Sequence, residues 1–408
     1  MRSSSLQALQ CRRLADTLAR ARSMELYAGR IDPAVRIESL NDLRRLPVTT
    51  KTHLRALPRI DAGLAVVRSD VRRWHASSGT TGRRTAVGYT DADLRLWAEV
   101  TARALSQSGI GRGTIVHNAF GYGLFTGGLG FQLALDQLGA TVIPASIGPS
   151  LEDHLSLMEE FGAEALLCTP SFAARLAERR PSLPRLRVGV HGGESWTQAL
   201  RARIEVGLGI EVFNTYGLSE VIGPGVAHEC ASHRGLQLYE DHFLAEVVVP
   251  GTTDPVPDGE VGELLLTTLS AQACPRLRYR TGDLVCLESS PGPDGQQIRR
   301  ITKVLGRLSD RLLGTGVMPT AIEQALLSLP EAGVHYQLHL RSDRKLLSVR
   351  LEPRRTLDQT DWARLQQRAS AALGGLGLEV PVAVVPPGTL PRSSGKAPRV
   401  VIDPHPQA

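Results

Sequence analysis

The chain has 408 residues, of which 42% are hydrophobic, so it can bury a large core and fold as more than one domain. Its formal net charge is +6, but the basic residues are scattered among 41 acidic ones, and aromatic residues make up only 4% of the chain. This composition argues against a nucleic-acid partner, because neither a basic stripe nor a set of stacking aromatic side chains is visible.

The N-terminal segment, residues 1–23, contains basic residues but lacks the apolar stretch of a signal peptide. No apolar run elsewhere reaches the length needed to span a membrane, and the five cysteines are odd in number and widely spaced, unlike a disulfide framework. We therefore expect a cytoplasmic protein with no membrane partner.

Residues 76–90, ASSGTTGRRTAVGYT, are rich in glycine and hydroxyl side chains and include Arg83 and Arg84. A loop of Gly, Ser and Thr offers N–H and hydroxyl donors to an anion at close range, and the arginines would neutralise it. This chemistry suits a polyphosphate. The sequence is neither a Walker A nor a dinucleotide-binding pattern, and taken alone it is equally consistent with a solvated turn.

Strand-type and helix-type segments alternate from residue 114 to residue 180. The predicted strands are 114–120, 141–145 and 164–169, and the predicted helices are 129–139, 151–162 and 171–180. This alternation is typical of an α/β domain with a parallel sheet covered on both faces.

The pattern changes near residue 235, where β-branched and apolar residues come in strand-length pieces separated by Pro, Gly and Asp. Further on, residues 320–333 and 360–377 predict helices, and residues 336–341 and 346–353 predict strands. We predict an N-terminal domain over 1–305 with a β-rich subdomain at about 235–300, and a small α+β domain over 306–408.

Several motifs occur in a fixed order along residues 36–402: SSGTTGRRTAVGYT, NAFGYGLFTGGLG, GGESW, NTYGLSEVIGPGVAHEC, YEDHF, YRTGDL, GRLSDRLL and LPRSSGKAPRVV. This series resembles the adenylate-forming superfamily, in the form found in phenylacetate-CoA ligases. The resemblance implies an α/β fold with a large N-terminal domain and a small mobile C-terminal domain. It also implies that a carboxylate attacks the α-phosphate of ATP to give an acyl-adenylate, and that the thiol of CoA then displaces AMP.

The resemblance assigns roles to residues that would be ordinary turn or surface groups if they stood alone. Glu220 would hold Mg²⁺, Asp283 would accept the ribose hydroxyls, Arg307 would reach the ribose or phosphate, and Lys396 would bridge the carboxylate and the α-phosphate. The remaining predicted nucleotide contacts are Ser77, Ser78, Gly79, Thr80, Thr81, Gly82, Arg83, Gly193, Glu194, Tyr216 and Gly217.

Aromatic and glycine residues in FGYGLFTGG predict a slot for a flat aryl or arylacetic acid. The residues predicted to line it are Phe120, Tyr122, Phe125, Gly127, Gly192, Ile222 and Pro224. Phe and Tyr at this spacing are equally typical of an ordinary hydrophobic core. Cys230 and Cys274, near His228 and His233, suggest a structural zinc ion, although the paired spacing of a zinc motif is missing and buried free cysteines are the alternative.

The sequence thus predicts an ATP- and Mg²⁺-dependent aryl-CoA ligase, with homodimerisation expected from relatives. The segment GTGVMP (314–319) is shorter than expected near the thiol site, and Ser309 stands where relatives often have Asp or Lys at the hinge. The acceptor therefore stays open between CoA, a carrier-protein thiol and an amine. A non-catalytic nucleotide-binding paralogue is a further alternative. The joint presence of Glu220, Asp283, Arg307 and Lys396 argues against it.

Overall fold

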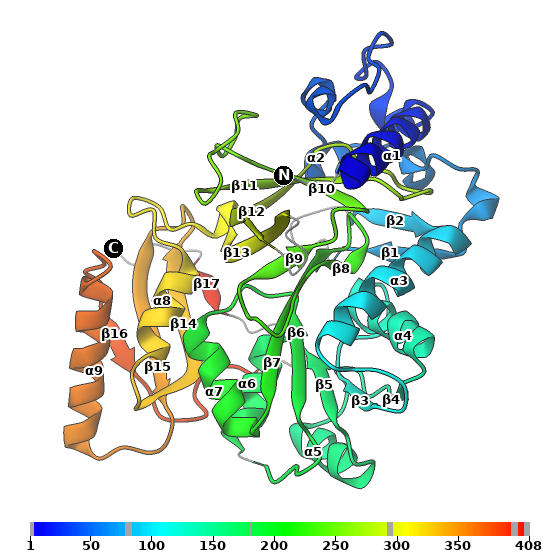
Figure 1. The fold of residues 1–408 in the computed structure, drawn as a ribbon. Coiled ribbons are helices and arrows are strands. Elements are labelled where there is room, and N and C mark those ends of the chain that lie inside the picture. The colour runs from blue at the N-terminus through cyan, green and yellow to red at the C-terminus, as the bar shows by residue number, and fades with distance from the viewer. Residues whose placement is uncertain (1–3, 78–83, 180, 292–296, 393–398, 404–408) are drawn as a thin grey trace.

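The computed structural model of the chain describes residues 4–77, 84–179, 181–291, 297–392 and 399–403 (Figure 1). Within these ranges, eleven strands form one large mixed sheet. From one edge to the other its strands are β10 (Phe243–Val248), β11 (Val261–Thr268), β12 (Tyr279–Pro291), β13 (Gln297–Arg307), β9 (Leu236–Leu238), β8 (Gly223–Glu229), β7 (Glu211–Leu218), β6 (Val188–Gly192), β5 (Ala165–Cys168), β3 (Ile115–Asn118) and β4 (Thr141–Ile143).

The half of this sheet from β4 to β7 is parallel, as the alternating pattern predicts. The helices on it are α3 (Asp91–Gln107), α4 (Thr126–Leu138), α5 (Leu151–Glu160), α6 (Pro170–Glu178) and α7 (Gln198–Leu208). Because successive side chains of a strand point to opposite faces, Leu167 of β5 packs in the same core as Phe131 of α4, whereas Leu166 packs with Phe172 of α6. Helices therefore cover both faces of the sheet (Figure 1).

The β-rich part of the chain continues the same sheet instead of standing apart from it. β7 pairs antiparallel with β8, β8 with β9 and β9 with β13, after which β12, β11 and β10 follow antiparallel. Arg307 ends β13, so this strand runs two residues past the predicted domain boundary between 305 and 306.

The first 90 residues add a cap on the β-rich edge that the sequence patterns did not predict. It contains α1 (Ser4–Arg22), α2 (Lys51–Arg55) and the hairpin of β1 (Arg73–Ala76) with β2 (Ala86–Tyr89). Gln10 and Thr17 of α1 donate hydrogen bonds to the carbonyls of Glu240 and Leu269, and Leu14 is fully buried. Short 3₁₀ helices lie at Glu25–Tyr27, Leu40–Arg45, Ile60–Gly63 and Arg68–Asp70, and another follows β13 at Leu308–Asp310.

The C-terminal part forms a separate small sheet with its own core, in the region where an α+β unit was predicted. The strand order is β16 (Val382–Val384), β15 (Leu346–Pro353), β14 (Ala332–Arg341) and β17 (Val400–Asp403), and the packed helices are α8 (Pro319–Leu327) and α9 (Gln359–Gly374). Ile322 of α8, Leu338 of β14 and Leu365 of α9 are fully buried together.

We expect the free energy of unfolding to fall as the pH drops from 7 to 5. His117, His191 and His228 are fully buried in the large sheet, and burial lowers their pKa values to about 3, about 4 and about 3. Below pH 6.5 the unfolded chain therefore binds protons that the folded chain does not, at a cost of up to about 1.4 kcal/mol per pH unit for each histidine. Urea unfolding at several pH values measures this slope, and a flat profile would contradict it.

Candidate active site

Four of the predicted nucleotide-site residues lie where β7 ends and turns into β8, next to the paired strands β12 and β13. In sheets of this type, ligands bind outside the carboxyl ends of the parallel strands. Tyr216 lies on β7, Asp283 on β12 and Arg307 on β13, and Glu220 stands in the turn after β7. Residues far apart in the sequence therefore meet at one edge of the sheet.

Asp283 links the predicted adenine and ribose contacts. It lies directly opposite Arg307 in the β12–β13 ladder, with 3.5 Å between its Oδ1 and Arg307 Nε. The Tyr216 hydroxyl donates to Asp283 Oδ2 at 2.5 Å. Burial raises the pKa of Asp283, while Arg307 and the tyrosine hydrogen bond oppose that shift. The Arg307 side chain is half exposed, whereas Asp283 beside it is buried.

Glu220 is buried, and its side-chain partner is a residue that sequence reasoning did not assign. Lys51, the first residue of α2, places Nζ 3.1 Å from Glu220 Oε1. The signal that would have found it was its rarity, because Lys51 is one of only four lysines in the chain. A carboxylate oxygen is a ligand type that Mg²⁺ prefers, and here the Lys51 ammonium already neutralises this carboxylate, so Mg²⁺ would compete with the ammonium for it.

The backbone of Glu220 is also held by a cation. Arg276, which is fully buried, donates from Nε to the carbonyl oxygen of Glu220 at 3.2 Å. Beside it, Ser219 Oγ lies 3.1 Å from Thr126 Oγ1 at the start of α4. These contacts fix the turn between β7 and β8 before any ligand binds.

The turn after β6 contains Gly192, Gly193 and Glu194. A Cβ on Gly192 would lie 2.4 Å from the carbonyl oxygen of Thr215, and Gly193 has a φ of +81°, so both positions require glycine. Glu194 accepts hydrogen bonds from the backbone N–H and the hydroxyl of Ser171, which places its carboxylate at the start of α6. Gly217 is equally constrained, because its Cβ would lie 1.8 Å from the carbonyl oxygen of Gly223.

The predicted acyl-pocket residues occupy different environments. Phe120 is buried and stacks on Phe131, and Gly127 lies against its ring. The Tyr122 hydroxyl accepts a hydrogen bond from Asn118 and donates one to Gln132, each at 2.8 Å. Phe125 is exposed. The aromatic residues of FGYGLF therefore divide between core and surface, and their contact with an acid stays a prediction.

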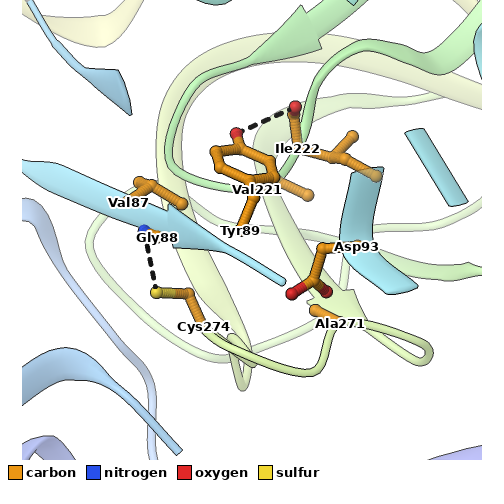
Figure 2. Close-up of a pocket in the computed structure, with 8 residues that line it drawn as sticks. All are labelled: Val87, Gly88, Tyr89, Asp93, Val221, Ile222, Ala271 and Cys274. Atoms are coloured by element: carbon orange, nitrogen blue, oxygen red, sulfur yellow. Dashed lines mark hydrogen bonds between the residues drawn. The ribbon is translucent and has the colours of Figure 1, made fainter. Parts of the chain in front are cut away.

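A small pocket lies beside the Glu220 turn, and the lining residues include Ile222 (Figure 2). Its other lining residues are Val87, Gly88, Tyr89, Asp93, Val221, Ala271 and Cys274. The Tyr89 hydroxyl donates to the Ile222 carbonyl at 3.0 Å. Trp97 and Thr101 of α3 likewise donate to the carbonyl of Pro224. The backbone at the start of β8 is therefore held by side chains of α3, which are not among the predicted slot residues.

Several predicted contacts fall in segments that the structure does not describe. Ser78, Gly79, Thr80, Thr81, Gly82 and Arg83 of the phosphate loop, and Lys396, lie outside the described residues. Ser77 is described and closes the base of the loop, because its N–H donates to the Thr85 carbonyl and its hydroxyl accepts from the Thr85 N–H.

The zinc interpretation is not supported. Among the described residues, no group of three His, Cys, Asp or Glu side chains is placed to hold a metal ion. Cys230 contacts Ser232 Oγ at 3.1 Å and Arg300, whereas Cys274 is buried and accepts from the Gly88 N–H (Figure 2). Both cysteines are free thiols with separate local partners, and neither is placed as a metal ligand in the described part of the chain.

Replacing Lys51 by methionine tests the contact with Glu220. We expect a lower melting temperature without ligand, because a buried carboxylate that loses its partner costs about 1–3 kcal/mol. Mg²⁺ together with a non-hydrolysable ATP analogue should then raise the melting temperature more in the variant than in the parent, since the cation replaces the lost ammonium group. Thermal unfolding measures both values. Lys303→Met, at an exposed position of β13, is the control, and equal increments in all proteins would contradict the prediction.

Of the helices in the described ranges, none has the length and apolar character to cross a membrane.

Residues 68–270 match the family model of AMP-binding enzymes, and residues 314–403 match that of the AMP-binding enzyme C-terminal domain. The chain is 42% identical over 392 residues to phenylacetate-coenzyme A ligase of Thermus thermophilus, covering 89% of this chain and 87% of the relative. It is also 42% identical over 416 residues to phenylacetate-coenzyme A ligase of Escherichia coli, with coverages of 97% and 94%.

Solved structures agree with these relatives. The fold matches 2-hydroxyisobutyryl-CoA ligase in the postadenylation state, in complex with 2-HIB-AMP, with a TM-score of 0.89 at 25% identity over 99% of this chain and 90% of that chain. The same ligase in the thioesterification state, with 2-HIB-AMP and CoA, gives a TM-score of 0.71 at 25% identity, with coverages of 99% and 91%. The fold class predicted from the motifs is confirmed.

Proposed function

Since this chain belongs to the phenylacetate-coenzyme A ligase family of AMP-binding enzymes, we propose that it activates an aryl or arylacetic acid with ATP and transfers the acyl group to CoA. The observation that carries the proposal is the cluster of Tyr216, Asp283 and Arg307 next to the buried Glu220. These groups supply an aromatic face, a hydroxyl acceptor, a cation and a metal-binding carboxylate, which together suit Mg²⁺ and ATP.

In the first step, charge builds up between the attacking carboxylate and the α-phosphate. Glu220 would hold Mg²⁺, which supplies charge neutralisation at the phosphates when it is bound. Asp283 would accept the ribose hydroxyls and Arg307 would reach the ribose or phosphate side. Lys396 would bridge the two reacting anions, and the loop from Ser77 to Arg83 would hold the β- and γ-phosphates.

The proposed acid is aromatic, because the relatives at 42% identity carry phenylacetate in their names. On the chain itself, Ile222 borders a pocket next to the Glu220 turn, and Pro224 follows it on β8. This pocket is too small to hold an aromatic ring, so the slot for the acid is proposed from the family and from the residues of FGYGLFTGG. Contacts to ring substituents decide among aryl acids by small differences in binding.

The acceptor is proposed to be CoA, and the experiment separates it from the alternatives. ATP–pyrophosphate exchange is measured over a panel of benzoic, phenylacetic, cinnamic, amino-substituted aryl and fatty acids, and CoA is then added with mass detection of the product. Exchange with an aryl acid and an acyl-CoA mass is the expected result. Exchange without acyl-CoA would instead favour a carrier-protein thiol or an amine, and no exchange with any acid would favour a non-catalytic nucleotide-binding protein.

A further inference from the structure

We propose that Arg203 is a positioning residue that stabilises the adenylate-forming arrangement of the small sheet against the large one. This inference rests on the proposed function and adds to it a device that balances the two half-reactions. Arg203 lies on α7, a helix of the large unit that lies beside the small unit (Figure 1). Its guanidinium donates to the carbonyl of Leu327 at the end of α8.

The side-chain hydrogen bonds of Arg203 all cross between the two units. Its Nε and Nη2 donate to the carbonyl of Leu327 at 3.0 and 2.7 Å, and Nη2 also donates to the carbonyl of Leu329 at 2.7 Å. Nη1 donates to the carbonyl of Ala332, the first residue of β14. These carbonyls belong to the last turn of α8, the loop after it and the first residue of β14.

A guanidinium is well suited to this place. The carbonyls at the end of a helix lack partners within the helix and carry partial negative charge, so a cation there is stabilising. The five donors of arginine form a planar fork that can serve several carbonyls at once. Burial lowers the pKa of Arg203 to about 10, so the group keeps its charge at neutral pH.

Other polar contacts surround Arg203 along the same interface. Thr197, the N-cap of α7, donates to Glu323 Oε1 at 3.1 Å, and the Ala199 N–H donates to Gln324 Oε1 at 3.1 Å. Glu178 of α6 accepts from His335 at 3.0 Å. The ends of α6 and α7 therefore contact α8 and β14 through a row of hydrogen bonds.

This row leads toward the segment with the predicted catalytic lysine. The second oxygen of Glu323 accepts from the Tyr336 hydroxyl at 3.0 Å and lies 3.6 Å from Arg399. Arg399 also stacks over the Tyr336 ring, with 4.2 Å between its Cζ and the ring centroid. Glu323 thus joins the N-cap of α7 to the residue that follows 393–398 in the chain.

The arrangement of the two units resembles one state of a relative more than another. The TM-score is 0.89 against the postadenylation state of 2-hydroxyisobutyryl-CoA ligase and 0.71 against its thioesterification state. A contact made in only one arrangement stabilises that arrangement by its own free energy. Because Arg203 donates only to the other unit, its removal leaves the hydrogen bonds within each unit intact.

The test compares the two half-reactions in Arg203→Ala and Arg203→Lys. ATP–pyrophosphate exchange reports acyl-adenylate formation, and thioester formation from supplied acyl-adenylate and CoA reports the second step. We expect Arg203→Ala to lower exchange about tenfold, the size expected for a lost hydrogen bond to a charged group, while the second step keeps its rate or gains. The exchange rate of Arg203→Lys should lie between those of Arg203→Ala and the parent, because an ammonium keeps the charge but loses the planar set of donors.

Arg364→Ala, which removes an exposed arginine of α9 paired with Asp361, is the matched control and should leave both rates unchanged. Equal losses in both steps, or no loss in either, would overturn the role of Arg203 while leaving the proposed function in place. If the parent protein itself shows no exchange with any acid, both proposals fail. Thermal unfolding of each variant shows whether the protein is folded, and Arg203→Lys keeps the test decisive if the alanine variant does not fold.

Discussion

Replacing Glu220 by glutamine is expected to lower acid-dependent ATP–pyrophosphate exchange by about 10²–10³-fold. Glutamine has the same shape but no charge, so it would hold Mg²⁺ poorly. The fold should survive, because the amide oxygen can still accept from Lys51 and the backbone carbonyl can still accept from Arg276. Exchange measured over a range of Mg²⁺ concentrations should show a shift to higher metal as well as a lower maximum.

Glu229 provides a matched control for this variant. It is also buried and also paired with a cation, since Arg201 Nη2 lies 2.6 Å from Glu229 Oε2. Glu229 is the last residue of β8, the strand that follows the Glu220 turn. Glu229→Gln should lower thermal stability but keep the Mg²⁺ dependence of exchange. If both glutamine variants lose exchange to the same extent, Glu220 has a structural role and not a metal-binding one.

Replacing Lys396 by alanine is expected to lower the rate of acyl-adenylate formation by about 10²–10³-fold. The rate of thioester formation from supplied acyl-adenylate should stay unchanged. The physical reason is that an ammonium between two anions matters only while the carboxylate attacks the α-phosphate. Both sides of residues 393–398 are anchored on the small unit. Arg392 pairs with the buried Glu352 at 2.6 Å, and Arg399 lies 3.6 Å from Glu323.

The control for Lys396→Ala is Lys345→Ala, which removes another lysine of the small unit, at an exposed position before β15. It should leave both half-reactions unchanged. A parallel loss of both steps in Lys396→Ala would mean that the lysine is required for the shape of the protein, or for both arrangements. Retained exchange would remove Lys396 from the first half-reaction altogether.

The alternating elements were predictable because each one carries its own periodicity. The predicted strand 164–169 contains β5, and the predicted helix 151–162 contains α5, since buried apolar runs and amphipathic faces appear directly in the residue order. The N-terminal cap was not predictable in this way. α1 is rich in arginine and weakly apolar, and its position depends on carbonyls of Glu240 and Leu269, more than 200 residues away.

The residues of the candidate site are likewise of two kinds, those that the sequence motifs identify and those that only the fold brings to the site. Tyr216 and Glu220 can be found from the sequence because they stand in the motif NTYGLSE, and Asp283 because it stands in YRTGDL. Each motif is a short run of residues that can be recognised without the fold. Arg276 stands in no such motif, and Lys51 is distinguished only by the small number of lysines in the chain. Their importance arises only when α2 and the segment before β12 fold against the turn between β7 and β8.

The sequence by itself determined the class of fold and the class of chemistry, because both depend on local periodicity and on short motifs whose order is kept along the chain. Only the tertiary structure decided which cations contact Glu220 and that Glu194 accepts hydrogen bonds at the start of α6. It also decided that Arg203, from the large unit, donates to the carbonyls at the end of α8. The reason is physical. A buried polar group must find a partner wherever the folded chain supplies one, and the order of residues does not state which distant group that is.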